Sequence, residues 1–216
     1  LAGFLAAMRP LAPSASFTCC VPFPLEPLRR RFPAVKWAPC DEAHRAQAIA
    51  ACDVWLGVGG SPFQSAQSRW FLDHLVGETA YCQREDKPMF FLGVGVQTAA
   101  ELEMPEVREI CARARGIWTR DAASTARLGA LGLPVSVETA ADLAHLFFRA
   151  SPPPPATANR LTLVANFDYS AWPGQAACLG AVEQGPATDR VWLAQESRDL
   201  PGAERALFAA LPAATQ

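Results

Sequence analysis

An arginine–aspartate pair follows a short apolar stretch in the second half of the chain. Gly116–Thr119 is typical of a strand, and Arg120 and Asp121 come directly after it, ahead of a helical run. A guanidinium at the carboxyl end of a strand can present its fork of N–H donors to a phosphate or carboxylate. Asp121 is placed to cap the helix, with Ser124 in its first turn. An ion pair of Arg120 with Asp121 or Asp142 is the alternative.

A second candidate segment is the turn Gly59-Gly60-Ser61, which follows a predicted strand over Asp53–Val58. Glycines let the backbone approach a ligand closely, and a helix that starts after the turn offers unpaired N–H groups to an anion. The turn fits neither the dinucleotide fingerprint nor the Walker loop, because its glycine spacing differs and no lysine follows. A tight turn without a ligand is the alternative.

The third segment is the strand over 88–96, which is continuously apolar and is therefore expected to be covered on both faces. Gly93 and Gly95 lie at alternate positions in it, so we expect a close neighbour on one face, with a packed helix favoured over a ligand. Gln97 follows at the carboxyl end, where open parallel sheets bind ligands. Gln97 is therefore a candidate polar contact.

Histidines and cysteines give no metal signal. His44 and His74 fall in predicted helices, and the pair Asp142 and His145 is too weak a pattern to predict a metal or acid–base site. No cysteine has the spacing of a zinc site, and an odd number of scattered cysteines predicts free thiols in a reducing compartment. The seven are Cys19, Cys20, Cys40, Cys52, Cys82, Cys111 and Cys178. The sequence predicts no metal and no cofactor.

Strands and helices alternate at short intervals, which predicts βαβ units and a Rossmann-like α/β fold with a parallel sheet and flanking helices. Strands are expected over 15–21, 53–58, 88–96, 116–119 and 135–138, and after a proline-rich stretch over 161–165 and 191–194. Helices are expected over 1–8, 25–32, 43–51, 67–83, 106–115, 122–131, 141–148 and 202–211. Pro10 is expected to stop the first helix, and Gly132 to end the helix over 122–131.

The run of prolines after Ser151 predicts a domain boundary. We expect a Rossmann-like domain over 1–150 that lacks its first strand, a linker over 151–159, and an incomplete second α/β domain over 160–216. The formal net charge of −2 argues against a nucleic-acid partner. No apolar run reaches the length needed to span a bilayer, so a cytoplasmic protein without a transmembrane segment is expected.

Three segments in this order resemble the polysaccharide pyruvyl transferase family. They are D-x-W-L-G-V-G-G-S at Asp53–Ser61, L-G-V-G-V-Q at Leu92–Gln97, and W-T-R-D-x-x-S with its following L-G-L at Trp118–Leu133. A weaker likeness is W-L-A-Q-E-x-x-x-D at Trp192–Asp199. The resemblance covers about residues 15 to 200, apart from the linker.

The resemblance implies two Rossmann-like domains facing a cleft, as in GT-B glycosyltransferases. It also implies transfer of a pyruvyl group from phosphoenolpyruvate to a saccharide or lipid-linked saccharide acceptor in cell-surface polysaccharide synthesis. Under it the anion contacts fall on Arg120 and the turn Gly59-Gly60-Ser61, with Gln97, Asp121 and Ser124 beside them. The general acid has no counterpart in this chain, which is therefore expected to be inactive alone.

Two other functions share this architecture. A sugar-nucleotide glycosyltransferase would need an acidic residue that binds ribose, and none is visible. A non-catalytic binding or scaffold domain is favoured by the strand that begins at Leu161, because it lacks the arginine that family members often carry there. The resemblance places the transferase first.

Overall fold

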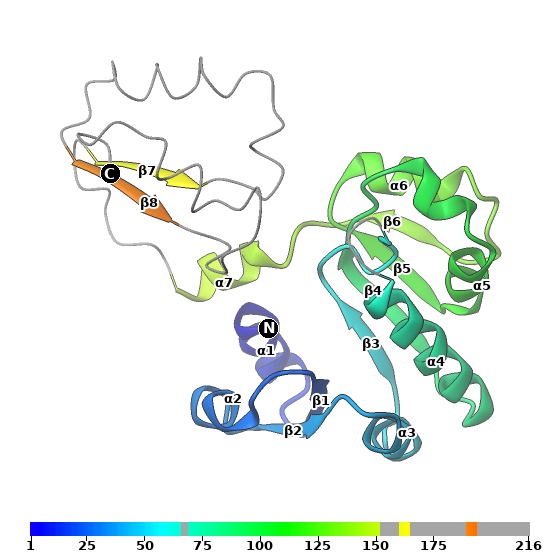
Figure 1. Cartoon of the computed structure of the whole chain (residues 1–216), viewed down its shortest axis with the longest axis horizontal. Helices are drawn as coiled ribbons and strands as arrows, with labels where there is room; N and C mark the ends of the chain where they lie inside the picture. Colours follow the sequence, from blue (N-terminus) through cyan, green and yellow to red (C-terminus); the bar gives the residue numbers. More distant parts are fainter. Residues whose placement is uncertain (66–68, 152–159, 165–188, 194–216) are drawn as a thin grey trace. The chain divides into compact units, whose positions relative to one another are not determined.

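The computed structural model describes residues 1–65, 69–151, 160–164 and 189–193 (Figure 1). The chain divides into two compact units, Leu1–Pro152 and Pro153–Gln216, with the boundary inside the proline-rich stretch. In the second unit β7 (Arg160–Val164) pairs in parallel with β8 (Asp189–Leu193). The helix expected over 202–211 lies outside the described residues. Among those described, no helix is long and apolar enough to cross a bilayer.

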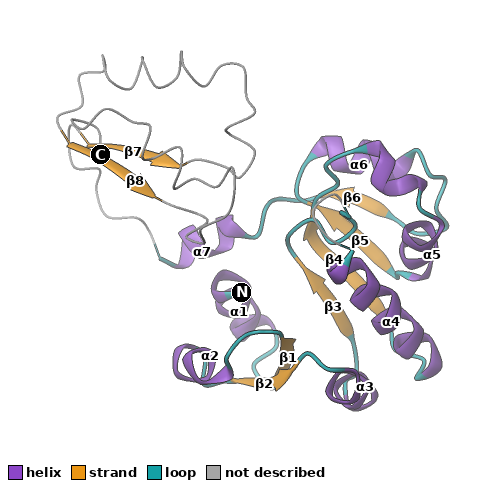
Figure 2. Cartoon of the chain, in the orientation of Figure 1, coloured by secondary structure: helices purple, strands orange, loops and turns teal. Residues whose placement is uncertain are grey.

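The first unit alternates helices and strands, and all of its described strand pairs are parallel, which confirms the α/β fold with flanking helices (Figure 2). Its main sheet has four strands in the order β3-β4-β5-β6. The strands are β3 (Trp55–Val58), β4 (Met89–Val94), β5 (Gly116–Thr119) and β6 (Val137–Thr139). The helices between them are α4 (Trp70–Arg84), α5 (Pro105–Arg113) and α6 (Ala122–Gly129), with a 3₁₀ turn over Ala99–Glu103 and α7 (Ala144–Ala150) after β6.

A separate two-stranded sheet, β1 (Phe17–Val21) with β2 (Val35–Pro39), precedes the main sheet in the chain. The expectation of one continuous sheet is therefore wrong for the described residues, because no hydrogen-bonded pairing joins β1 to β3. Strand β2 was also not predicted. Its side chains alternate, with Val35 and Trp37 buried and Lys36 exposed, but this alternation spans only three residues before Ala38 and Pro39 and is too short to predict a strand. The helices of this part are α1 (Ala2–Leu11), α2 (Leu25–Arg31) and α3 (Glu42–Ala51).

The core of the first unit lies on the face of β4 that carries Phe91. The expectation of cover on both faces is wrong for the described residues, because Phe90 and Leu92, which point to the other face, are only partly buried. Phe91 is fully buried and its ring packs against Trp55 and Phe63, with centroids 5.4 Å apart in both pairs. Helix α4 contributes its buried residues Leu72, Leu75, Thr79 and Cys82. Trp70 and Phe71, at the start of the helix, are about half exposed and lie outside this buried face.

Several helix ends differ from expectation, among them the end of α5 at Arg113 and the start of α7 at Ala144. Helix α1 continues through Pro10 to Leu11, since a proline near the carboxyl end removes only one hydrogen bond. Helix α4 begins at Trp70 rather than at residue 67. Helix α6 ends at Gly129, with Ala130 as its C-cap, and Gly132 takes its left-handed conformation (φ +61°) in the turn that follows.

We predict that replacing Phe91 by alanine lowers the free energy of unfolding by about 3–5 kcal/mol, because a buried ring leaves a cavity. The matched control is Phe23→Ala, where the ring is 65% exposed, and its expected change is within about 0.5 kcal/mol. Urea unfolding followed by tryptophan fluorescence measures both. Equal losses in the two variants would contradict a core centred on β4.

Candidate functional site

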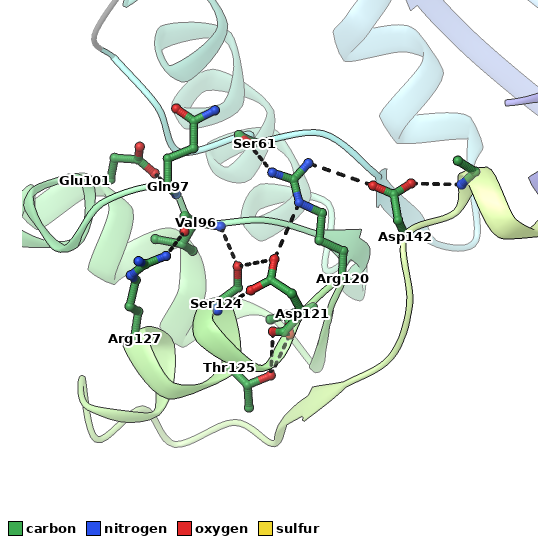
Figure 3. A network of polar contacts seen from close by, with 12 residues as sticks. Ser61, Val96, Gln97, Glu101, Arg120, Asp121, Ser124, Thr125, Arg127 and Asp142 are labelled. Atoms are coloured by element: carbon green, nitrogen blue, oxygen red, sulfur yellow. Dashed lines mark hydrogen bonds and ion pairs between the residues drawn. The ribbon is translucent and has the colours of Figure 1, made fainter. Parts of the chain in front are cut away.

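The candidate residues meet at one edge of the main sheet, where β3, β4 and β5 end. Backbone hydrogen bonds carry the strand pairing into the turns beyond them. Gly59 donates to the carbonyl of Leu92 (2.8 Å), Gly95 donates to Gly60 (2.8 Å), and Arg120 donates to Val94 (2.9 Å). Segments 25 or more residues apart in the sequence are thus held side by side (Figure 3). This edge is where parallel sheets bind ligands.

The turn after β3 requires glycine for its backbone conformation. Gly59 and Gly60 have φ of +70° and +73°, a region that other residues enter at a cost. A Cβ on Gly60 would meet no atom within 4 Å, so space is not the reason for that glycine. Ser61 follows, and the buried ring of Phe63 anchors the segment in the core. Helix α4 starts nine residues after Ser61, so its N-terminus does not belong to this turn.

Gly93 in β4 and Gly95, directly after the strand, make room for different neighbours. A Cβ on Gly95 would lie 2.6 Å from the guanidinium carbon of Arg120. A Cβ on Gly93 would lie 2.6 Å from Cγ of Leu143, and Gly93 sits in a bulge with φ of +66°. The close neighbour that the sequence predicts beside these glycines is present. At Gly95, however, that neighbour is not a packed helix. There an arginine side chain crosses the end of the strand.

Arg120 is the cation at the centre of this edge. One nitrogen lies 3.4 Å from Oγ of Ser61, and others lie 3.6 Å from Asp121 Oδ2 and 4.0 Å from Asp142 Oδ2 (Figure 3). The expected ion pairs are therefore present, but they are long. The side chain is 31% exposed. A guanidinium has five N–H donors, so these contacts leave it capacity for an incoming anion.

Asp121 and Ser124 join helix α6 to the end of β4. The backbone N–H of Ser124 donates to Asp121 Oδ1 (2.7 Å), which confirms the predicted N-cap, and its hydroxyl donates to Oδ2 (3.0 Å). Ser124 Oγ also accepts from the N–H of Val96 (2.9 Å). The bond from the Ser124 N–H is the main cause that lowers the pKa of Asp121. Both residues thus fix the backbone on either side of Arg120. Their contact with a substrate remains a prediction.

Gln97 is exposed just beyond β4, and its backbone N–H donates to Glu101 Oε2 (3.2 Å). Its side chain points away from Arg120 in Figure 3. Arg127, which the sequence reasoning missed, donates to the carbonyl of Val96 (2.5 Å). Arg127 lies on α6, which begins directly after Arg120 and Asp121, and that position is the signal that could have identified it. The edge therefore carries a second arginine that fixes the end of β4.

The histidines and thiols offer no chemistry at this edge. His44 Nδ1 contacts Asp41, which caps α3, and His74 Nδ1 contacts the carbonyl of Trp70. Within the described ranges no cluster of His, Cys, Asp or Glu could hold a metal ion, and the six cysteines there are free. Burial raises the pKa of Cys82 and of Cys111 to about 12. Neither is an activated thiolate.

We predict that Asp121→Ala destabilises the domain by about 0.5–2 kcal/mol near neutral pH, because α6 loses its cap. The pKa of Asp121 is lowered by folding, so its contribution is full above the unfolded-state pKa near 4 and is lost as pH falls through the lower folded value. Urea unfolding between pH 7 and pH 2.5 measures it, with the exposed Asp53→Ala as control. A difference from wild type that persists at pH 2.5 would contradict this role.

No protein-family model, no curated protein and no solved structure matches this chain. The geometry of the carboxyl edge therefore carries the functional argument together with the sequence motifs. That edge combines a left-handed glycine turn, a serine hydroxyl and a partly exposed guanidinium. Such a set can hold a small anion.

Proposed function

We propose that this chain carries the donor-binding domain of a polysaccharide pyruvyl transferase-like enzyme with a GT-B-like pair of domains. The observation that carries the proposal is the guanidinium of Arg120, 31% exposed beside Ser61 and the Gly59-Gly60 turn at the carboxyl edge of the sheet. Two of the three sequence motifs that resemble the family end at this edge, and the third contains Arg120. We place the reaction in the cytoplasm, where phosphoenolpyruvate is available.

The donor in this proposal is phosphoenolpyruvate, which carries a carboxylate and a phosphate. Arg120 would hold one of these groups through its fork, with the hydroxyl of Ser61 as a further donor. The reaction protonates the methylene carbon of the donor, and sugar hydroxyls attack the neighbouring carbon as phosphate leaves. Fixed cationic donors favour it by stabilising the leaving phosphate. No described residue is assigned as the general acid.

A non-catalytic domain of the same fold is the second candidate, and one observation favours it. Asp121 and Asp142 both lie within 4.0 Å of Arg120 and neutralise part of its charge. An arginine held by two carboxylates can serve structure alone. The two candidates differ in whether an anion replaces these carboxylates.

We predict saturable binding of phosphoenolpyruvate by calorimetry, weakened about 10- to 100-fold in Arg120→Ala, because charge-assisted hydrogen bonds are lost. Arg115→Ala is the matched control. That arginine lines a shallow hollow with Lys87 and Arg113 at the opposite, amino edge of β4 and β5. Equal affinity of wild type and Arg120→Ala, or no binding by folded wild type, would contradict the donor site. Binding of a sugar nucleotide instead would favour a glycosyltransferase.

We also predict that Asp142→Asn tightens phosphoenolpyruvate binding about three- to tenfold, because it removes a negative charge that competes for Arg120. The control is Asp53→Asn, an exposed carboxylate that precedes β3. The same calorimetric titration measures both variants. Weaker binding in Asp142→Asn would mean that Asp142 positions Arg120 for the anion instead of competing with it.

A further inference from the structure

Helices α1 and α2 cover the same face of the two-stranded sheet. Phe17 in β1 is paired with Val35 in β2, and Trp37 lies two residues further along, so all three side chains point to one face. Helix α1 packs on this face through Phe4, whose ring centroid lies 5.8 Å from that of Phe17. Helix α2 packs there through Phe32 at its C-cap, whose ring centroid lies 6.2 Å from that of Trp37.

Helix α7 extends this layer through α1. The two helices are in contact, and Gly3 of α1 lies so close to the backbone of Phe147 that a Cβ there would overlap it. Figure 1 shows α1 between α2 and α7. No residue of α2 or of α7 is fully buried. The outer sides of the three helices therefore form one exposed surface.

This surface carries the most exposed large hydrophobic side chains of the described residues. Leu11 at the end of α1 is 78% exposed, Phe23 just before α2 is 65% exposed, and Phe148 in α7 is 53% exposed. Phe147 is 41% exposed, and its ring packs edge-on against that of Phe148. Exposed apolar side chains gathered in one part of a surface indicate a site of interaction.

The same helices carry an excess of positive charge. Residues 1–32 contain four arginines and one carboxylate, Glu26, and α7 adds Arg149 with no carboxylate, whereas the whole chain has a formal net charge of −2. Arg30 pairs with Glu26 (2.9 Å), and among the described residues the other four have no carboxylate partner. All five arginines are exposed. We call these arginines and the four apolar side chains the α1–α2–α7 patch: Leu11, Phe23, Phe147, Phe148, Arg9, Arg29, Arg30, Arg31 and Arg149.

We propose that the α1–α2–α7 patch binds the surface of an anionic lipid bilayer, with its phenylalanine rings inserted among the headgroups. Arginines are attracted to the negative surface of such a membrane, and apolar side chains gain free energy where headgroups meet acyl chains. A nucleic acid would also suit the charge, but it gains nothing from an aliphatic side chain such as Leu11, whereas a bilayer does. None of these side chains belongs to the candidate site around Arg120, so the proposal stands independently of the proposed function.

Vesicle flotation of the full chain tests the proposal. Vesicles of phosphatidylcholine alone are compared with vesicles that also contain about 30% phosphatidylglycerol. At low salt we expect the chain to float with the anionic vesicles and to bind the neutral vesicles only weakly. Raising the salt from about 0.05 M to about 0.5 M is expected to weaken binding to the anionic vesicles at least about tenfold, because salt screens the arginines.

The contribution of charge is tested by replacing Arg29, Arg30 and Arg31 by glutamine. This variant is expected to bind the anionic vesicles about 100-fold more weakly, because three attractions to the membrane surface are lost. The matched control makes the same change at three exposed arginines outside the patch, which are Arg84, Arg108 and Arg115. Its affinity is expected to stay within about threefold of wild type. Equal weakening in the two variants would overturn the proposal, because the net charge of the chain would then explain binding.

The contribution of the apolar side chains is tested by combining Phe23→Ser with Phe148→Ser. This variant is expected to bind the anionic vesicles at least about tenfold more weakly, because two rings no longer leave water. The matched control combines Phe71→Ser with Val76→Ser in α4, where the side chains are 48% and 38% exposed, and it is expected to bind like wild type. Unchanged binding of the Phe23 and Phe148 variant would overturn the proposal.

Three further results would also overturn it. The first is an absence of flotation with anionic vesicles at low salt. The second is tighter binding to a single-stranded RNA than to the vesicles at the same salt, which would identify a nucleic acid as the partner. The third is dimerisation of the chain in sedimentation that the Phe23 and Phe148 substitutions abolish, which would identify a second copy as the partner.

Discussion

The parallel pairing of β4 with both β3 and β5 is the constraint on which the rest of the first unit depends. It aligns three strands in one direction, so Val58, Val94 and Thr119 end at one edge although they are far apart in the sequence. The core follows from the same pairing, because it aligns Phe91 with Ile117 on one face of the sheet, where both are fully buried. The turns that could bind a ligand extend from these strands and share their hydrogen-bond ladder.

The glycines at this edge of the sheet are as important to its structure as the charged residues are. Gly59 and Gly60 are needed for left-handed backbone, while Gly95 is needed for space, because Arg120 lies where its Cβ would be. The capping hydrogen bonds of Asp121 fix the helix that follows Arg120. The guanidinium is thus positioned by its surroundings before any ligand arrives, which lowers the ordering cost of binding.

Local patterns could be predicted from the sequence, and pairings between distant segments could not. The continuous apolar run of β4 and the position of Asp121 before a helix each have a local physical cause, and the structure confirms both. Strand β2 was missed because its alternation of buried and exposed residues is only three residues long, from Val35 to Trp37. The contact of Arg120 with Gly95 joins residues 25 positions apart, and strand pairing alone brings them together. The division into two sheets could not be predicted from the sequence either, because local sequence does not specify which strand edges pair.

The central claim is that the carboxyl edge around Arg120 holds a small anion, and NMR of the side-chain Nε–H of Arg120 tests it most directly. The signal is assigned by comparison with Arg120→Lys, and the protein is titrated with phosphoenolpyruvate and with inorganic phosphate. The account predicts a saturable shift of this signal together with the amides of Gly59, Gly60 and Ser61. Saturable shifts confined to other arginines, such as Arg113 and Arg115 at the opposite edge, with the Arg120 signal unmoved, would contradict it.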